Sequence, residues 1–326
     1  MQCNEDNTRV KFYSCSCYYT DNIFLEEYKL HIRFLSAQQF RTDYQTVLTT
    51  LGCSTDRHYE EILKKIEEEV ERRRQLGLKS AERSRLIKEA YKPLHKQLYF
   101  LQESYLAPEF LHIVNYCRSD EASEEGLLDC ILPSAAKQVY RFPVFNKKFC
   151  EELIEELEHF ERSEAPKGRP NTMNNYGILL NELGFDEGFI TPLRENYLRP
   201  VAALLYPDCG GHCLDSHKAF VEFTEGNLYF GDMRQVPLSD SECAEVEHRV
   251  AEGLLHRGQQ MHGALPISSG QRWNLIIWMR ASSERNKLCP MCSKQPRLVQ
   301  GDRFADGFTA DDSQSGISQN MRCILN

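Results

Sequence analysis

The 326-residue sequence lacks three features that would connect it with a membrane, a nucleic acid or the secretory pathway. No run of 18 or more apolar residues occurs, so we expect no membrane span. The net charge of -9 argues against a broadly basic surface for nucleic acid. There is no Asn-x-Ser/Thr glycosylation sequon, and residues 1–25 do not resemble a signal peptide. We therefore expect an intracellular protein, in the cytoplasm or the nucleus.

The 13 cysteines are scattered along the chain. A small secreted disulfide scaffold would be shorter and richer in cysteine, so we predict mainly reduced thiols. Cys289 and Cys292 have the C-x2-C spacing of zinc ligands, but no second pair follows at zinc spacing. Cys209, His212 and Cys213 supply three further soft ligands, so a Cys3His zinc site that joins the two segments is one hypothesis. Reduced structural cysteines and a redox-sensitive pair are the alternatives.

Two highly charged helices are predicted over residues 57–92. Gly77 separates the two helices, and Pro93 ends the second. Charged residues cover one face of the first helix. Apolar residues recur at helical spacing on the opposite face, and these are Tyr59, Ile62, Ile66 and Val70. This region is predicted to be a scaffold or a surface for a protein partner.

The sequence predicts an α+β fold. A helical N-terminal region covers residues 1–118, and an acidic linker rich in small residues covers 119–135. A domain with short strands follows at 136–308, with a helical support over 146–205 and a β core over 213–281. The first helix of the support should span 146–162, and four short strands are expected at 220–223, 227–230, 253–256 and 273–279. Strands at this spacing indicate a sandwich or jelly roll, and the polar residues 309–326 are predicted to be disordered.

The segment GLLHRGQQMHGALPISSGQRWNLIIWM, at 253–279, carries the most functional information. His262 lies at the end of one expected strand, and Arg272 lies ten residues later at the start of the next. An imidazole is a good Fe(II) ligand, and a guanidinium can bind a carboxylate with two hydrogen bonds. This His-x9-Arg arrangement resembles the 2-oxoglutarate and Fe(II)-dependent oxygenases of the prolyl/lysyl hydroxylase type.

Further segments carry the same resemblance. The hairpin from His262 to Arg272 is similar to that of lysyl hydroxylases. FTEGNLYF, at 223–230, resembles the F-x-G-G-x-L-x-F strand of the family, with Glu225 in place of the first glycine. Three more segments resemble a vertebrate member over essentially the whole chain: RFPVFNKKFCEELIEELEHFERSEAPKGRPNTMNNYGILL, PDCGGHCLDSHKAF and LCPMC.

The resemblance implies a double-stranded β-helix (jelly-roll) oxygenase domain. It implies an oxidoreductase that couples decarboxylation of 2-oxoglutarate to oxidation of a substrate C–H bond, with Fe(II), 2-oxoglutarate and ascorbate as cofactors. His262 corresponds to the distal iron ligand and Arg272 to the partner of the 2-oxoglutarate carboxylate. The substrate is not implied.

The chain departs from the family at the other two iron ligands, which come from a His-x-Asp motif ahead of the F-x-G-G strand. No His-x-Asp occurs here, because SHKAFV runs directly into EFTEGNLYF. We therefore expect an incomplete β-helix and an impaired iron site. Asp215 and His217, two residues apart on an expected strand, could act as substitute ligands with His262, or could have an ordinary loop or strand-edge role.

Two functional hypotheses remain open from the sequence. In the first, the family's oxygenase activity is retained, either because substitute ligands hold the metal or because a full-length form is the working protein. In the second, it is a catalytically inactive interaction protein that binds a partner through the charged helices at 57–92. A single imidazole cannot hold Fe(II) tightly, and this favours the second hypothesis for this chain.

Overall fold

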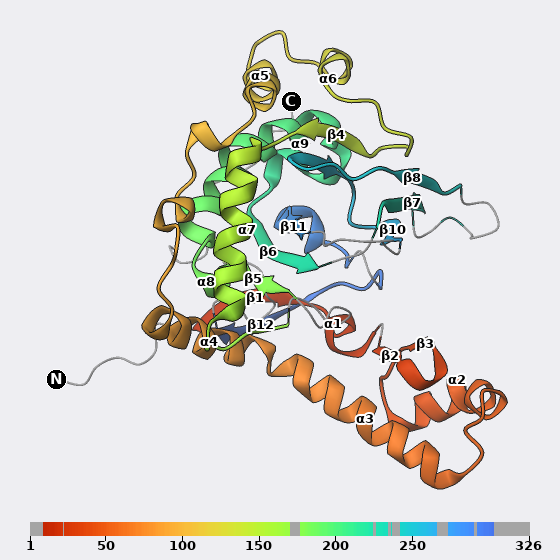
Figure 1. Cartoon of the computed structure of the whole chain (residues 1–326). Helices are drawn as coiled ribbons and strands as arrows, with labels where there is room; N and C mark the ends of the chain where they lie inside the picture. Colours follow the sequence, from red (N-terminus) through yellow and green to blue (C-terminus); the bar gives the residue numbers. More distant parts are fainter. Residues whose placement is uncertain are drawn as a thin grey trace. The chain divides into compact units, whose positions relative to one another are not determined.

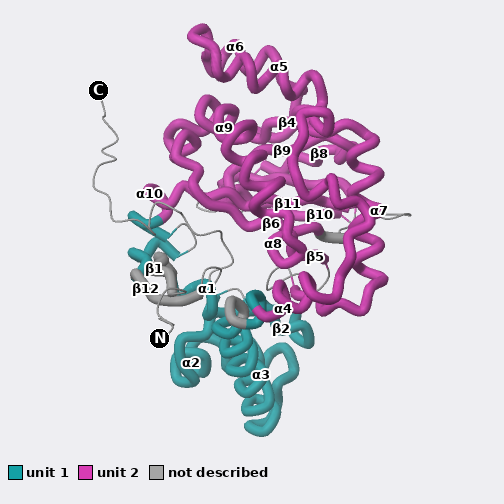
Figure 2. The backbone as a smooth tube through the Cα atoms, turned by 90° about the vertical axis from the view of Figure 1, so that its left-hand side faces the viewer, with its two compact units in different colours: residues 1–81, 171–173, 286–326 teal, residues 82–170, 174–285 magenta. Residues whose placement is uncertain are grey.

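The computed structural model describes residues 9–21, 23–169, 177–223, 226–233, 236, 242–265, 273–289 and 292–302. The chain divides into two compact units, which Figure 2 shows in different colours. Unit 1 comprises residues 1–81, 171–173 and 286–326, and unit 2 comprises 82–170 and 174–285. The polar tail expected at 309–326 and most of the loop before Gly177 lie outside the described residues.

Unit 1 joins residues from both ends of the chain. Its elements are β1 (Arg9–Ser14), α1 (Cys17–Thr20), β2 (Ile23–Leu25), β3 (Leu30–Ile32), α2 (Ala37–Thr50), α3 (Asp56–Arg74), the start of α4 (Leu76–Ala90) and β12 (Arg297–Asp302). β1 pairs antiparallel with β12, and β2 pairs antiparallel with β3. The β1–β12 ladder brings together two segments that are far apart in the sequence.

α3 confirms the predicted amphipathic helix. All four apolar residues of the predicted face are buried, and they pack with Phe40 and Leu48 of α2 in one hydrophobic cluster. Thr55 caps the helix, since its side-chain oxygen accepts a hydrogen bond from the backbone N–H of His58 at 3.2 Å. The break between the two charged helices falls at Gln75 rather than at Gly77, which lies inside α4.

Unit 2 contains most of the helices and strands. Its helices are the end of α4, α5 (Pro108–Cys117), α6 (Glu124–Cys130), α7 (Lys147–Arg162), α8 (Leu180–Leu183), α9 (Arg199–Leu205) and α10 (Ser282–Arg285). π-Helical turns at Asp186–Ile190 and Leu193–Leu198 lead into α9. The predicted helix at 146–162 is confirmed by α7.

The strands of unit 2 form three small antiparallel sheets. They are β4 (Tyr140–Pro143), β5 (Ile178–Leu179), β6 (Ser216–Phe223), β7 (Leu228–Met233), β8 (Ala244–Val246), β9 (Glu252–Leu255), β10 (Gln260–Ala264) and β11 (Trp273–Arg280). The strand orders are β11-β6-β5, β10-β7-β8 and β4-β9. The four short strands predicted from the sequence are confirmed as parts of β6, β7, β9 and β11.

The core of unit 2 forms where α7 packs beside the β11-β6-β5 sheet (Figure 1). Phe149, Leu153, Leu157 and Phe160 of α7 are buried, at the positions that the helical period predicts. From β6, Ala219 and Val221 join the same cluster. This sheet is therefore anchored by its apolar face against a long helix.

The α+β class is confirmed, but the double-stranded β-helix is not. Within the described ranges the strands form separate sheets of two or three, and no sheet closes into a barrel. β6 and β7 belong to different sheets although only residues 224–227 separate them. As a result β10 and β11 each lie at the edge of their sheet, paired on one side.

The boundary between the units differs from the sequence analysis. The expected acidic linker at 119–135 contains helix α6, and Leu127 on α6 is fully buried in the core of unit 2. Ser123 caps α6 by accepting a hydrogen bond from the N–H of Gly126. The chain divides instead between Ala81 and Glu82, inside α4. The acidic composition of 119–135 reflects the exposed face of a short helix.

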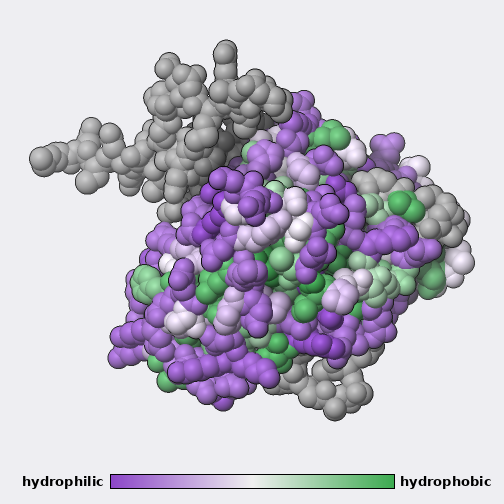
Figure 3. Space-filling view, turned by 90° about the horizontal axis from the view of Figure 1, so that it is seen from above, coloured by the Kyte–Doolittle hydropathy of each residue, from purple (hydrophilic) through white to green (hydrophobic). Residues whose placement is uncertain are grey.

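None of the helices in the described parts of the chain has both the length and the apolar character needed to cross a membrane. On the face seen in Figure 3, hydrophilic residues cover most of the described surface, and apolar residues lie in small patches between them.

Glu156 of α7 is a fully buried carboxylate in the core of unit 2. It accepts hydrogen bonds from the hydroxyls of Tyr91 (2.7 Å) and Tyr99 (2.8 Å) and from the backbone N–H of His95 (2.6 Å). Burial and the charge of Glu156 raise the pKa of both phenols above the usual value, so the phenols stay protonated as donors. The carboxylate thus ties α7 to the segment that follows α4.

Replacing Glu156 should destabilise unit 2. Glu156→Ala removes the acceptor of three donors, of which Tyr91 is buried and the other two are half-buried, so we expect the free energy of unfolding to fall by about 3 kcal/mol. Glu155→Ala is the matched control on the same helix, since Glu155 is exposed and should cost less than about 1 kcal/mol. Urea unfolding followed by tryptophan fluorescence measures both, because the two tryptophans, Trp273 and Trp278, lie in unit 2. Equal losses for the two variants would contradict this role of Glu156.

β10 and β11 lie at sheet edges among the described residues, and this position should make the chain prone to aggregate. An edge strand presents unpaired N–H and C=O groups, and a charged residue on the edge discourages pairing with a second chain. Met261 on β10 is 40% exposed, so we expect Met261→Lys to slow aggregation at least about two-fold in light scattering. Val250→Lys is the control with the same charge, at a 70% exposed site outside the strands. Equal slowing by both variants would show that net charge, and not the edge, controls aggregation.

Candidate functional site

His262 lies on β10 opposite Phe230 of β7, next to a bulge in the ladder. Its side chain is exposed, and its Nδ1 lies 2.7 Å from the carbonyl oxygen of Gln260. A carbonyl oxygen only accepts hydrogen bonds, so Nδ1 carries the hydrogen and Nε2 keeps its lone pair. The geometry of His262 is therefore compatible with a ligand role through Nε2.

A second imidazole, which the sequence analysis did not single out, accompanies His262. The ring of His256 lies 4.6 Å from that of His262 and 4.9 Å from Phe230, centroid to centroid. Burial, and then the neighbouring His262, lower the pKa of His256 to about 4, so its ring is neutral at pH 7. No short motif marks His256 in the sequence, because the pairing of β10 with β7 is needed to bring these rings together.

The residues described around His262 do not complete a two-histidine, one-carboxylate iron site. Across the described ranges, one group of three or more His, Cys, Asp or Glu ligand atoms lies within mutual reach, and that group contains only cysteines. His262 belongs to no such group, and the sequence has no His-x-Asp motif. A facial iron site needs three protein ligands, so the residues described here do not fit Fe(II).

Asp215 and His217, the suggested substitute ligands, have other partners. Asp215 precedes β6 and accepts hydrogen bonds from the N–H and the hydroxyl of Ser282, which opens α10. His217 is fully buried, with Nδ1 3.1 Å from Nη1 of Arg194 and Nε2 3.4 Å from a carboxylate oxygen of Asp186. These contacts match an ordinary structural role for both residues. Arg272 lies outside the described residues.

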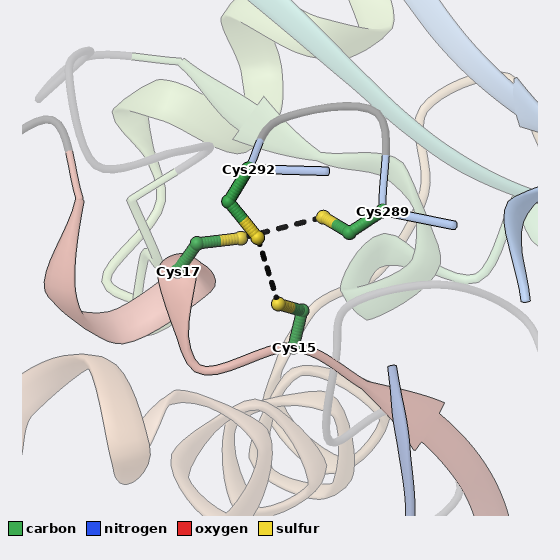
Figure 4. A group of neighbouring side chains, drawn as sticks. All are labelled: Cys15, Cys17, Cys289 and Cys292. Carbon is green, nitrogen blue, oxygen red and sulfur yellow. Dashed lines mark hydrogen bonds between the residues drawn. The ribbon is translucent and has the colours of Figure 1, made fainter. Parts of the chain in front are cut away.

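The one group of potential metal ligands in the described chain consists of Cys15, Cys17, Cys289 and Cys292, here called the cysteine cluster. The four sulfur atoms lie within 4.8 Å of one another, and the four side chains point toward one another (Figure 4). The Sγ of Cys15 is 3.2 Å from that of Cys292, and the Sγ of Cys17 is 3.4 Å from that of Cys289. Burial and the neighbouring thiols raise the pKa of Cys17 far above its usual value.

The cluster differs from the zinc site that the sequence suggested. Cys289 and Cys292 are used, but their partners are Cys15 and Cys17. Where the structure is described, neither Cys209, His212 nor Cys213 belongs to a ligand group. Cys209 is exposed and accepts a hydrogen bond from the guanidinium of Arg257. The missed signal is the short C-x-C spacing of Cys15 and Cys17, which comes hundreds of residues before the C-x2-C pair.

Comparison with known proteins identifies one family. Residues 87–211 match the family model of the OGFOD2-like domain. The chain is 62% identical to a zebrafish (Danio rerio) protein named 2-oxoglutarate and iron-dependent oxygenase domain-containing protein 2, over 97% of this chain and 99% of the relative. Proteins of the same name from Xenopus tropicalis and Homo sapiens are 53% and 48% identical, over 91% and 92% of this chain and 93% and 95% of each relative.

The alignment with the zebrafish relative spans 343 positions, which is more than the 326 residues of this chain. That relative therefore contains residues that have no counterpart here.

Proposed function

This chain belongs to the family of 2-oxoglutarate and iron-dependent oxygenase domain-containing protein 2, and from that premise we propose that it is an oxygenase relative with an impaired iron site. The family resemblance gives the reaction class, which is oxidation of a substrate C–H bond coupled to decarboxylation of 2-oxoglutarate. In this proposal Fe(II), 2-oxoglutarate and ascorbate are the cofactors of the intact family fold. His262 and Arg272 are what this chain keeps of the iron and 2-oxoglutarate sites.

One observation supports the proposal of impairment: among the described residues His262 has the imidazole of His256 beside it, but the two belong to no group of three ligand atoms that could hold iron. Its closest described ring partners are His256 and Phe230, and it belongs to no group of three ligand atoms in the described residues. Two imidazoles and water, without the third protein ligand of a facial site, do not bind Fe(II) tightly enough to keep it at a specific site.

The course of the backbone supports the same proposal. β6 passes into β7 through residues 224–227 alone, at the place where the family has a strand, a loop and the His-x-Asp motif. In the described part of the chain, β10 and β11 each pair with another strand on one side, an arrangement that agrees with the loss of intervening strands from a double-stranded β-helix. The gaps in the alignment with the zebrafish relative agree with such a loss.

Anaerobic titration with Fe(II) and 2-oxoglutarate tests the proposal. We expect no binding in the micromolar range for this chain, because two of the three family ligands have no counterpart. The readout is the absorption of the iron chelate of 2-oxoglutarate, which needs an open coordination site and so is not given by four thiolates. The zebrafish relative, prepared in the same way, is the positive control.

Two variants distinguish the outcomes of this titration. Micromolar binding that is lost in both His262→Ala and Asp215→Ala would show a rearranged triad, and the impairment would be refuted. Binding that survives both substitutions would place the iron elsewhere and would refute the role of His262. Absence of binding in the parent chain, with binding in the zebrafish control, supports an inactive form.

A second proposal is that the chain acts by binding a protein partner through the charged helices at 57–92. The observation that favours it is the geometry of α3, which buries one face in unit 1 and exposes a long charged face. On that face Arg57 pairs with Glu61, and Lys64 pairs with Glu68, all largely exposed. Exposed pairs of this kind add little stability, so they can be exchanged for contacts with a partner.

Charge reversal tests this second proposal. Arg57→Glu with Lys64→Glu makes the exposed face of α3 strongly acidic without touching its buried side. In proximity labelling, we expect this variant to lose specific proteins that the parent chain labels. Lys137→Glu with Lys148→Glu, on two exposed side chains of unit 2, makes the same change in net charge away from α3. An identical set of labelled proteins for all three forms would exclude this face as the binding surface.

A further inference from the structure

The cysteine cluster is built by the two segments that the β1–β12 ladder joins in unit 1. The last pair of the β1–β12 ladder is Ser14 of β1 with Arg297 of β12. Cys15 follows directly after this pair in the sequence. Cys17 opens α1, and the backbone N–H of Tyr18 donates to the carbonyl of Cys15 at 3.1 Å. This tight turn places the sulfurs of Cys15 and Cys17 on the same side.

The second pair is held by a turn of its own. The N–H of Cys289 donates to the carbonyl of Lys294, and the N–H of Ser293 donates to the carbonyl of Cys289, both at 2.8 Å. Ser293 has φ +56°, a left-handed conformation that residues other than glycine adopt infrequently. The turn folds back on Cys289, and the sulfurs of Cys289 and Cys292 face those of the first pair (Figure 4).

The spacing of the four sulfur atoms fits a tetrahedral metal centre. Four thiolates at the usual Zn–S distance of about 2.3 Å lie about 3.8 Å apart along each edge of the tetrahedron. The shortest separations in the cluster are 3.2 and 3.4 Å, and all lie within 4.8 Å. The observed range includes the ideal edge, so an ion at the centre needs only small movements of the side chains.

The burial of the cysteine cluster also favours a bound metal ion. Cys15, Cys17 and Cys289 are 5%, 7% and 1% exposed, and Cys292 packs against them. They form a buried cluster that contains no residue other than cysteine. Four converging thiols bury little apolar surface, so they contribute little to holding two chain segments together, and small structural units of this kind are commonly stabilised by a metal.

We propose that Cys15, Cys17, Cys289 and Cys292 bind one Zn²⁺, which ties residues 9–20 to residues 286–302. Four sulfur ligands select a soft or borderline ion such as Zn²⁺ and leave no open coordination position, so the role of the ion is structural. The site shares no residue with the iron and 2-oxoglutarate positions of the family. It therefore stands whether or not the chain is an active oxygenase.

Metal analysis of the full chain, purified without chelators, tests the proposal directly. We expect about one zinc per chain in the parent protein, and less than about a tenth of that in Cys289→Ser with Cys292→Ser. Cys209→Ser with Cys213→Ser is the matched control, because it also removes two cysteines and should keep the zinc. Iron in place of zinc would overturn the identity of the ion, and loss of zinc in the control would overturn the assignment of the ligands.

A single conservative variant separates metal binding from a disulfide. Cys292→His keeps a good zinc ligand but cannot form a disulfide, so it should retain zinc where Cys292→Ser loses it. Replacement of the zinc by Co²⁺ should give the visible absorption bands of a tetrahedral thiolate site in the parent chain.

The unaltered chain provides a test that does not depend on folding of the variants. Under native, non-reducing conditions, the four cysteines should resist alkylation until a chelator in denaturant removes the zinc. A metal-free parent chain whose mass shows Cys15–Cys292 and Cys17–Cys289 disulfides would overturn the proposal. A metal-free chain with four freely alkylated thiols would overturn it as well.

Discussion

The antiparallel ladder between β6 and β11 is the interaction on which the structure of unit 2 depends. It runs without a break from Ser216 opposite Arg280 to Phe223 opposite Trp273. In the middle of β6, Ala219, Phe220 and Val221 are at most 1% exposed, and α7 packs its apolar face into the same core. Burial of this apolar surface is the main stabilising contribution, and it persists although the flanking sheets stay small. The ladder therefore provides the framework on which the helices of unit 2 pack.

The physical requirements of this framework differ from those of an iron site. A core requires apolar surface at the right period, which α7 and β6 supply, and it tolerates changes at the sheet edges. An iron site requires three ligand atoms around one point, and no other arrangement replaces them. In the proposal above, the absence of the family's segment between β6 and β7 removes two ligands at once but leaves the helix-covered sheet. His262 keeps its position on β10, beside His256, without the partners that would make it a metal site.

Unit 1 presents the opposite case, since its proposed metal site is complete while its core is small. Phe40, Ile62 and Ile66 give α2 and α3 a core of their own. At the cysteine cluster, by contrast, the buried side chains are cysteines, which come from two segments far apart in the sequence. A zinc ion there would couple the folding of residues near Cys15 to that of residues near Cys292, because neither pair binds tightly alone. The two units then differ in what stabilises them: apolar packing in one, and apolar packing with a metal in the other.

Local periodicity is sufficient to predict α3 and α7, because a helix that buries one face must repeat its apolar residues every three or four positions. The sequence alone also determined the short strands that became parts of β6, β7, β9 and β11, whereas the role of His262, taken from the family resemblance, stays a prediction. Contacts between distant segments decided the rest. In the sequence, nothing distinguishes Glu156 from the other acidic residues of its helix. Its burial and its hydrogen bonds from Tyr91 and Tyr99 are evident only in the tertiary structure. Cys15 and Cys17 become ligand candidates only when β1 pairs with β12, because a metal site depends on distances in space that sequence separation does not reveal.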